Sequence, residues 1–373
     1  MVIYIVGMEV LMKRIILAGG GHGHINILKK IMKRTIKDCE IMLITDYEKQ
    51  YYSGMLPGFI GKIYTEEEIS FQVEEMCISA GVKFIKEKIV EIDGVKKIVK
   101  TVGINNYKNI KEYKFDLLSI NLGASAKRNF GINENMTYVK PINNIIEFVK
   151  KIDEQSPGEK KKMVIVGAGA SGIELAFAFR ARYPKLKIDV ISKNDILKNY
   201  NKKSTREVKK ELREKEIELI INDELMKVDE KNIFTEKNKK EYDYLIISNG
   251  VKGAEIDFIG YDVTKDNFLL VDENLKANDY TLAMGDSIEI KSYSRLPKAG
   301  VFAIRQAPIL YQNIVDILEG KKELKKYTPQ KKYLQLINYG DKRALMNYWK
   351  ISISGKIPWK IKNYIDMKYM RVK

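Results

Sequence analysis

Residues 14–28 read RIILAGGGHGHINIL, and this stretch decides the fold. The apolar run 14–18 is typical of a buried parallel strand. Gly19, Gly21 and His24 follow at the spacing of a dinucleotide-binding glycine turn, and a helix begins there. In such a turn the first glycine permits the tight bend, the second lets the backbone approach a pyrophosphate, and the third lets the helix pack closely. Because His24 stands in the third position, we expect the packing of this helix to differ.

A second stretch repeats the pattern. Residues 163–176 read MVIVGAGASGIELA, with all three motif glycines present at Gly167, Gly169 and Gly172. One glycine turn is weak evidence, but two in one chain, each followed by a helix and a further strand, predict two bound dinucleotides. We expect His22 and Gly23 to line the first pyrophosphate turn rather than to act as acid–base groups.

The strand after each helix should end in a residue that contacts the ribose, about 20 positions on. In the first unit of the pattern this place is held by Thr45 and Asp46, and Asp46 can accept hydrogen bonds from a ribose. In the second it is held by Ser192 and Lys193, and no carboxylate stands there to repel a 2′-phosphate. Pairing of Lys193 with that phosphate would favour NADPH tolerance over strict NADH use. The alternative is that Lys193 is an ordinary solvated charge.

Composition excludes several classes of protein. The chain has 373 residues, of which 45% are hydrophobic and 31% charged, as in a globular protein of two or three domains. Its longest apolar run, 1–12, is shorter than a membrane span and precedes its basic residues, unlike a signal peptide. Two cysteines predict a reducing cytoplasmic location. Two histidines leave no basis for a metal site or a Ser-His-Asp triad.

Further motifs resemble those of the pyridine nucleotide-disulfide oxidoreductase superfamily of flavoproteins. Residues 280–286, YTLAMGD, resemble that family's second FAD motif, which implies that Gly285 and Asp286 bind the flavin's ribityl chain. Residues 115–124 and 242–250 resemble its two crossover segments between domains. The resemblance covers positions 12 to about 320. It implies FAD and NAD(P)H as cofactors, with crossover contacts from Gly123, Ala124 and Gly250.

A closer resemblance is to the type II NADH dehydrogenase-like branch, in particular the flavoprotein found fused to or beside selenide, water dikinase. It is carried by residues 52–58, YSGMLPG, and 296–306, LPKAGVFAIRQ. By this resemblance Ser53 and Gly54 belong to the flavin site. A helix starting near 297–299 would direct its positive end at the charge of reduced flavin. The flavin-binding residues expected there are Lys298, Ala299, Gly300 and Val301.

Two side chains have alternative interpretations. We predict that Lys298 acts catalytically by stabilising reduced flavin, although a surface lysine would also fit. Glu174 follows the third glycine and either orients the nicotinamide or ribose, or is an acid favoured in a first helical turn. Disulfide reductases of this superfamily carry a cysteine pair beside the flavin, but residues 51–61 contain no cysteine. We expect Cys77 to fill a helix core and acidic neighbours to keep Cys39 unreactive.

Charge is concentrated at one end of the chain. Of the net +17, residues 321–373 carry +12, because they hold 15 basic and 3 acidic side chains. Both tryptophans lie there, and 356–373 predicts a short helix. Such a segment suits an anionic membrane surface on the inner face of the membrane. The alternatives are a helix that closes the flavin domain, or a lysine-rich solvated surface.

The predicted fold is α/β, with two nested Rossmann-like, doubly wound domains. FAD is expected in 12–125 and 251–320, NAD(P)H in 126–250, and the basic segment spans 321–373; residues 1–11 would be an extension outside the fold. The predicted activity is a flavin-dependent NAD(P)H oxidoreductase that reduces a quinone or similar acceptor without a redox-active disulfide. Alternatives are a reductase in selenium metabolism, or an NAD(P)H-sensing flavoprotein that binds nucleic acid, which we favour least.

Overall fold

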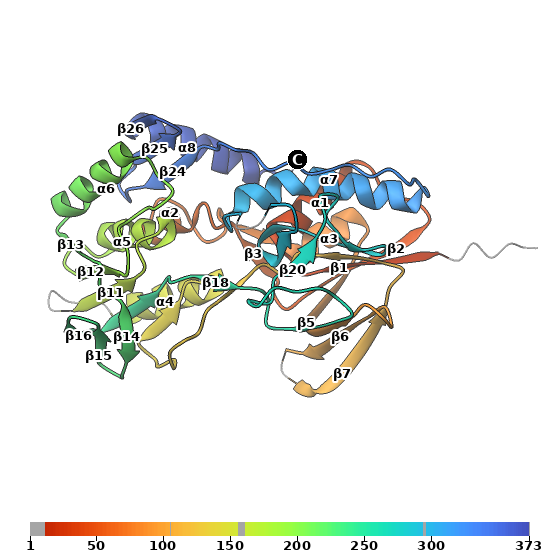
Figure 1. Ribbon diagram of the computed structural model, residues 1–373, viewed down its shortest axis with the longest axis horizontal. Coiled ribbons are helices and arrows are strands. Elements are labelled where there is room, and N and C mark those ends of the chain that lie inside the picture. The colour runs from red at the N-terminus through yellow and green to blue at the C-terminus, as the bar shows by residue number, and fades with distance from the viewer. Residues whose placement is uncertain (1–11, 105, 156–160, 294–295, 373) are drawn as a thin grey trace, which may run out of the picture. The chain divides into compact units, whose positions relative to one another are not determined.

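Two parallel-rich sheets carry the fold, as a computed structural model shows (Figure 1). The structure describes residues 12–104, 106–155, 161–293 and 296–372, so the predicted extension 1–11 lies outside the described residues. The chain divides into two compact units. The first unit comprises Met1–Gln50, Gln72–Gly123 and Gly253–Pro329. The second unit comprises Tyr51–Phe71, Ala124–Lys252 and Gln330–Lys373.

The first unit is built on a nine-stranded sheet with the order β21-β22-β8-β1-β2-β5-β6-β7, with β19 beside β5. From β22 to β5 the neighbouring strands are parallel, as the Rossmann-like prediction requires. The strands β21, β6 and β7 are antiparallel to their neighbours, and β19 pairs with β5 in parallel. The strands are β1 (Lys13–Ala18), β2 (Cys39–Thr45), β5 (Lys83–Asp93), β6 (Ile98–Gly103), β7 (Asn106–Lys114), β8 (Leu117–Ile120), β19 (Asp257–Ile259), β21 (Lys276–Asn278) and β22 (Thr281–Ala283). A separate pair is formed by β20 (Leu269–Val271) and β23 (Ile288–Ile290).

Three helices and a short 3-10 turn complete the first unit. Helix α1 packs against both α3 and α7 (Figure 1). The sequence predicts that Val73, Met76, Cys77 and Ala80 share a buried face, and these are the buried residues of α3. The strand β7 is the terminal strand of the sheet and is exposed along almost its whole length. The elements are α1 (His22–Lys33), α3 (Val73–Ala80), α7 (Gly300–Leu318) and η1 (Gly285–Ser287).

The sequence also predicts that a capping box of Thr65 and Glu68 opens the segment that holds Cys77, and this detail is wrong. Thr65 and Glu68 do form the reciprocal hydrogen bonds of a capping box, from the Thr65 amide to Glu68 Oε2 (2.8 Å) and from the Glu68 amide to Thr65 Oγ1 (3.3 Å). They close a turn rather than open the helix, because a short strand intervenes before α3 begins. That strand, β4 (Ser70–Gln72), pairs with β3 (Lys49–Tyr51).

The second unit has an all-parallel five-stranded sheet with the order β10-β17-β11-β12-β13. Its strands are β10 (Met136–Tyr138), β11 (Lys162–Val166), β12 (Lys187–Ser192), β13 (Ile217–Ile221) and β17 (Tyr244–Ile247). Smaller sheets are formed by β9 (Ser125–Ala126) with β18 (Val251–Lys252), and by β14 (Leu225–Val228), β15 (Asn232–Thr235) and β16 (Lys239–Glu241). The helices are α2 (Leu56–Ile60), α4 (Ile142–Gln155), α5 (Ala170–Arg182) and α6 (Lys202–Glu214).

Residues 51–71 group with the second unit, whereas the sequence analysis places them in the FAD-binding domain. The physical reason is the packing of α2 on α5. Arg182, near the end of α5, donates hydrogen bonds to the carbonyl oxygens of Ile60 (3.0 Å) and Phe59 (3.4 Å). Those carbonyls lie at the end of α2, where the helix leaves its last acceptors without internal partners. The other boundaries between the units lie at 123/124, 252/253 and 329/330.

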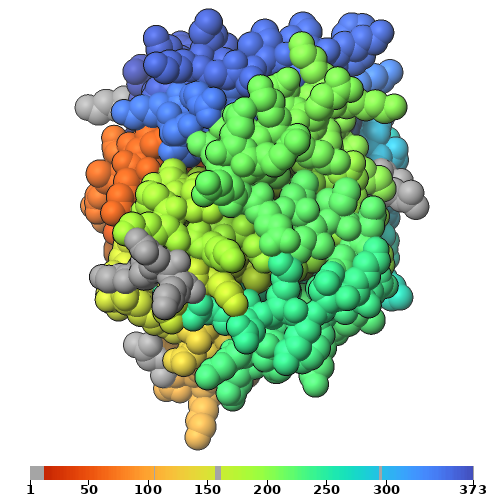
Figure 2. Space-filling model, turned by 90° about the vertical axis from the view of Figure 1, so that its left-hand side faces the viewer, coloured from red at the N-terminus to blue at the C-terminus, as the bar shows by residue number. Residues whose placement is uncertain are grey.

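The C-terminal residues also group with the second unit. They form an antiparallel sheet of β24 (Gln335–Asn338), β25 (Ala344–Tyr348) and β26 (Ile351–Gly355), followed by α8 (Lys356–Met370). In Figure 2 this blue segment lies directly against the green residues of the second unit. The contact is polar, since Ser204 of α6 bonds to Asn347 Oδ1 (2.8 Å) and Ser352 Oγ (2.9 Å). Within the described ranges, no helix is long and apolar enough to cross a bilayer.

Candidate functional site

The first glycine turn connects β1 to α1 at the carboxyl end of the sheet. Gly19 has a φ of +94°, and its amide donates to the Ile44 carbonyl of the neighbouring strand (2.8 Å). A Cβ on Gly19 would lie 2.6 Å from the Asn121 carbonyl oxygen, so only glycine fits. The predicted residues Gly21, His22 and Gly23 form the start of α1, whose first turn holds no acidic side chain. This arrangement leaves a helix N-terminus suited to a phosphate.

The predicted ribose contacts lie beside this turn. Thr45 ends β2 in a buried position, and a Cβ on Gly20 would lie 3.3 Å from its hydroxyl. Asp46 follows, and burial raises the pKa of its carboxyl above the ordinary value. Both side chains are therefore held at the end of the strand next to β1, which is where a dinucleotide's ribose lies in this fold.

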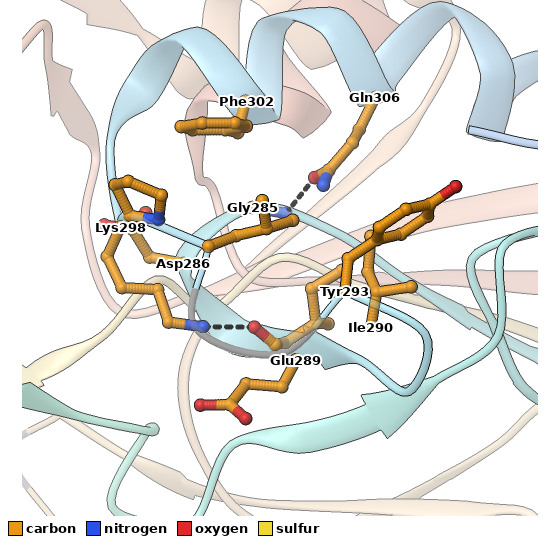
Figure 3. A pocket seen from close by; sticks show the side chains of 11 residues that line it. Gly285, Asp286, Glu289, Ile290, Tyr293, Lys298, Phe302 and Gln306 are labelled. Atoms are coloured by element: carbon orange, nitrogen blue, oxygen red, sulfur yellow. Dashed lines mark hydrogen bonds between the residues drawn. The ribbon is translucent and has the colours of Figure 1, made fainter. Parts of the chain in front are cut away.

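The second predicted flavin element belongs to the same edge of the same sheet. Gly285 follows β22 with a φ of +73°, and its amide donates to Gln306 Oε1 of α7 (2.7 Å; Figure 3). Asp286 occupies η1, and the neighbouring Ser287 accepts a hydrogen bond from the Gly123 amide (2.9 Å). The structure thus brings Gly19–Gly23, Thr45, Asp46, Gly123, Gly285 and Asp286 together at the carboxyl ends of parallel strands.

Lys298 lies in a small pocket beside Asp286, with room for about one water molecule (about 20 Å³; Figure 3). Its ammonium donates to the Ile288 carbonyl and lies 4.0 Å from the centre of the Phe268 ring. The predicted helix start at 297–299 is shifted slightly, because α7 begins at Gly300 with Ala299 as its N-cap. No side chain caps this end, so the helix dipole at Ala299, Gly300 and Val301 stays available for a flavin's negative charge. The catalytic role of Lys298 stays a prediction.

The second glycine turn connects β11 to α5. Gly167 has a φ of +108°, and its amide donates to the Ile191 carbonyl (2.7 Å). A Cβ on Gly172 would lie 1.9 Å from the Gly167 carbonyl oxygen, so the third glycine is required for close packing. A Cβ on Gly169 would meet nothing within 4 Å, and no side chain caps the helix start there. This open cradle fits the pyrophosphate of a nucleotide.

Ser192 and Lys193 lie at the end of β12, where the sequence predicts the 2′-phosphate contact. The Lys193 ammonium is paired with the Glu224 carboxylate at 2.6 Å; the lysine is largely exposed and the glutamate is partly buried. A phosphate at this position would therefore compete with Glu224 for the lysine.

Glu174 lies in a group of ionisable side chains that sequence reasoning did not find. Its Oε1 accepts a hydrogen bond from the Asn338 amide of β24 (2.8 Å). Removal from water raises the pKa of Glu174 to about 7, against the opposing effect of the Lys362 charge. Lys362 of α8 is buried, bonds to the Gly54 carbonyl and pairs with the buried Asp366 at 2.8 Å. One signal in the sequence could have indicated this group: Lys362 and Asp366 have opposite charges and lie four residues apart.

The remaining predicted residues are divided between the units. Gly123 ends a segment of the first unit, and Ala124 begins one of the second. Ser53, Gly54 and Gly250 also belong to the second unit. A Cβ on either Gly123 or Gly250 would meet nothing within 4 Å, so both crossover glycines face open space.

Both cysteines are free thiols, and their surroundings disfavour thiolate chemistry. Burial, with a contribution from Glu74, raises the pKa of Cys77 to about 12. Burial and then Asp38 raise the pKa of Cys39. Since the thiolate is the reactive form, neither residue has the environment of a redox-active cysteine.

Comparisons with known proteins agree with this geometry. Residues 13–307 match the family model described as pyridine nucleotide-disulphide oxidoreductase. The chain is 24% identical over 323 residues to the NADH dehydrogenase-like protein YutJ of Bacillus subtilis (strain 168), which covers 83% of this chain and 84% of the relative. It is 24% identical over 290 residues to Ferroptosis suppressor protein 1 of Taeniopygia guttata, covering 73% and 71%.

Solved structures show the same fold at low identity. NDH2 from Plasmodium falciparum in complex with NADH aligns with a TM-score of 0.82 at 15% identity, covering 96% of each chain. The sulfide:quinone oxidoreductase of Aquifex aeolicus aligns with a TM-score of 0.76 at 18% identity, covering 95% of this chain and 90% of that one.

Proposed function

Because the chain belongs to the pyridine nucleotide-disulphide oxidoreductase family and is an FAD-dependent NAD(P)H oxidoreductase, we propose that its electron acceptor is a quinone in an anionic membrane. FAD would occupy the Gly19 turn of the first unit and NAD(P)H the Gly167 turn of the second. Bound flavin takes a hydride from NAD(P)H and releases the electrons to an acceptor. Since neither cysteine has a reactive environment, the flavin would reduce the acceptor directly.

The observation that carries this proposal is the orientation of α8. The fully buried residues of this helix are Pro358, Lys362 and Asp366, and two of them are charged. Its exposed face carries lysines at 356, 360 and 368 together with apolar side chains: Ile357 is 71% exposed and Tyr364 is 64% exposed. A water-exposed helix keeps its apolar side chains on the buried face instead. The arrangement suits a partner that is itself apolar, as the interior of a bilayer is.

The outward apolar side chains of α8 belong to a larger surface, here called the apolar patch. It consists of Trp349, Ile351, Ile353, Ile357, Tyr364 and Ile365. Basic groups accompany it: the ammonium of Lys332 lies 3.6 Å from the centre of the Trp349 ring, and that of Lys350 lies 5.2 Å from it. Lysine and tryptophan together are favoured at the interface between anionic headgroups and acyl chains. We therefore propose an anionic lipid surface as the partner of the apolar patch.

The acceptor is tested by anaerobic reduction of the purified protein with NADH or NADPH, followed by reoxidation with separate acceptors. We expect a short-chain quinone to reoxidise the flavin at least as fast as oxygen or a small disulfide does. If an oxidised selenium compound is the sole acceptor that reoxidises the flavin, the quinone proposal is wrong and a reductase in selenium metabolism is favoured.

Membrane binding is tested by co-sedimentation with vesicles of anionic or neutral lipid. Substitution of Ile357, Tyr364 and Ile365 by serine should abolish binding to anionic vesicles. The matched control substitutes serine for Tyr107 and Ile110, which are comparably exposed in the first unit, and should bind as wild type does. Retention of binding by the α8 variant would exclude the apolar patch as the lipid contact.

A further inference from the structure

His24 stands where a dinucleotide-binding turn has its third glycine, and its side chain is 0% exposed. The ring contacts the turn itself, because Nδ1 lies 2.5 Å from the Gly19 carbonyl oxygen. It also contacts β8, because Nε2 lies 2.8 Å from the Ser119 hydroxyl. A glycine at this position would make neither contact. The imidazole therefore links both ends of the turn to the neighbouring strand.

The partners of His24 fix its tautomer. A carbonyl oxygen only accepts, so Nδ1 carries the proton and donates to Gly19. In a neutral ring Nε2 then accepts the hydrogen bond of the Ser119 hydroxyl. Burial lowers the pKa of His24 to about 4, so the ring is neutral at physiological pH. Both ring nitrogens are satisfied, as a buried polar group requires.

Asn121 fastens the same turn from the other side. Its Oδ1 accepts hydrogen bonds from the amides of Gly23 (2.9 Å) and His24 (3.3 Å), in the first turn of α1. Its Nδ2 donates to the carbonyl of Met284 (3.0 Å), directly before Gly285. One side chain thus joins the first glycine turn to the second flavin element.

The second glycine turn has no such attachment. Gly172 occupies the third position, where it packs on Gly167 without a polar side chain. Asn249 follows β17 as Asn121 follows β8, but its Oδ1 is buried with no hydrogen-bond partner among the described residues. Gly169 faces open space, as shown above. Among the described residues, the first turn is held by side-chain hydrogen bonds and the second is not.

We propose that His24 and Asn121 are positioning residues that hold the Gly19–His24 turn in its FAD-binding conformation before FAD binds. Preorganisation raises affinity because less conformational entropy is lost on binding. The proposal rests on the assignment of FAD to the first unit.

The test is FAD binding to apoprotein prepared by removing the flavin, followed by flavin fluorescence. His24→Gly, which restores the third glycine of the motif, and Asn121→Ala should each raise the Kd for FAD at least about tenfold, as the loss of two hydrogen bonds in the first variant and three in the second predicts. His24→Asn should recover most of the affinity, because its amide can still donate to Gly19. Asn249→Ala is the matched control in the second unit and should leave the Kd for FAD unchanged.

A second readout separates positioning from general stability. If His24 and Asn121 serve stability alone, the apoprotein variants will unfold at lower temperature while their Kd for FAD equals that of wild type, and the proposal is overturned. If His24→Gly does not fold, Ser119→Ala takes its place, because it removes only the hydroxyl partner of His24. An unchanged Kd for FAD in both Ser119→Ala and Asn121→Ala would also overturn the proposal. Absence of FAD binding by wild-type protein would instead contradict the assignment of FAD.

Discussion

Glu174 changes its charge close to neutral pH, which gives a testable dependence of stability on pH. Its pKa rises from 4.5 to about 7 on folding, so the folded state binds this proton more tightly than the unfolded state does. The tighter proton binding adds roughly 3 kcal/mol to the free energy of unfolding. This contribution is complete below pH 4.5 and is lost as the pH rises to 7. In Glu174→Gln this dependence disappears.

The measurement is the free energy of unfolding in urea at several pH values between 4.5 and 8. The difference between wild type and Glu174→Gln should change across this interval. Glu214→Gln, at an exposed position of α6, is the control and should follow wild type. Parallel curves for wild type and Glu174→Gln would show that the carboxyl is solvated.

Lys193 gives a second prediction at this scale, concerning nucleotide choice. NADPH should reduce the flavin at least comparably to NADH, since Lys193 can pair with the 2′-phosphate once that phosphate displaces Glu224. Lys193→Glu should shift the ratio of kcat/KM values toward NADH by on the order of tenfold. Glu224→Ala frees the lysine from its 2.6 Å ion pair and should shift the ratio toward NADPH. Identical ratios in all three proteins would show that Lys193 does not contact the cofactor.

Single residues were predictable from the sequence where a motif fixes the backbone. Gly19, Gly167 and Gly172 were predicted correctly as turn residues, because any side chain there would overlap a carbonyl group. The hydrogen bonds that join His24 to Ser119 and Asn121 to the Gly23 amide were not predictable, because their partners lie nearly one hundred positions apart. The motif showed only that His24 departs from glycine.

At the scale of elements, the cap of α6 also fastens the C-terminal sheet. Asn201 Oδ1 accepts the Ser204 amide (2.9 Å), and Asn201 Nδ2 donates to Asn347 Oδ1 (2.7 Å) and to the carbonyl of Trp349 (3.0 Å). We expect Asn201→Ala to destabilise the protein by about 2–3 kcal/mol, the sum of a lost cap and lost hydrogen bonds. Asn201→Asp keeps the cap acceptor but not the donor, so this variant should lose less of the free energy of unfolding than Asn201→Ala does.

Urea unfolding of the three proteins checks this prediction. Equal destabilisation by alanine and aspartate would assign the whole effect to the attachment of the C-terminal sheet. No destabilisation by aspartate would assign it to the cap alone.

Elements with strong local signals were predicted correctly, and those that depend on distant partners were not. The strand–turn–helix units and a helix from Lys356 are encoded by local pattern. The three-stranded sheet before that helix was missed, since its short strands depend on pairing and on the Ser204 contact. The exposed apolar side chains of α8 were also missed. Their position depends on Lys362, which faces inward because its ammonium bonds to the Gly54 carbonyl and to Asp366.

At the scale of the whole molecule, each unit should respond to its own nucleotide. Addition of FAD to apoprotein should slow hydrogen exchange in α1 and β8 of the first unit, and addition of NADPH should slow it around the start of α5 in the second. Bound ligand stabilises the region that holds it against local opening. Hydrogen exchange read by mass spectrometry makes the comparison. Protection of α5 by FAD alone would reverse the assignment of the two sites.

The nested order of the two units was predictable from the order of the motifs along the chain. One flavin element precedes the second glycine turn and the other follows it. The membership of residues 51–71 and 330–373 was not predictable, because it depends on tertiary packing of α2 and of the C-terminal sheet. The net charge showed that the last residues of the sequence are basic. It did not show which unit those residues pack on.

The exposed terminal strand β7 has a consequence for the protein in concentrated solution. A terminal strand of nine residues presents backbone groups that another chain could pair with, as in edge-to-edge aggregation. Lysines at 108, 111 and 114 interrupt its apolar side chains. Lys111 is paired with Glu87, so the lysines at 108 and 114 are the ones that repel a second copy of the same edge. Salt shortens the range of this repulsion, from about 10 Å at 0.1 M to about 3 Å at 1 M. The protection that these two lysines give therefore weakens as ionic strength rises.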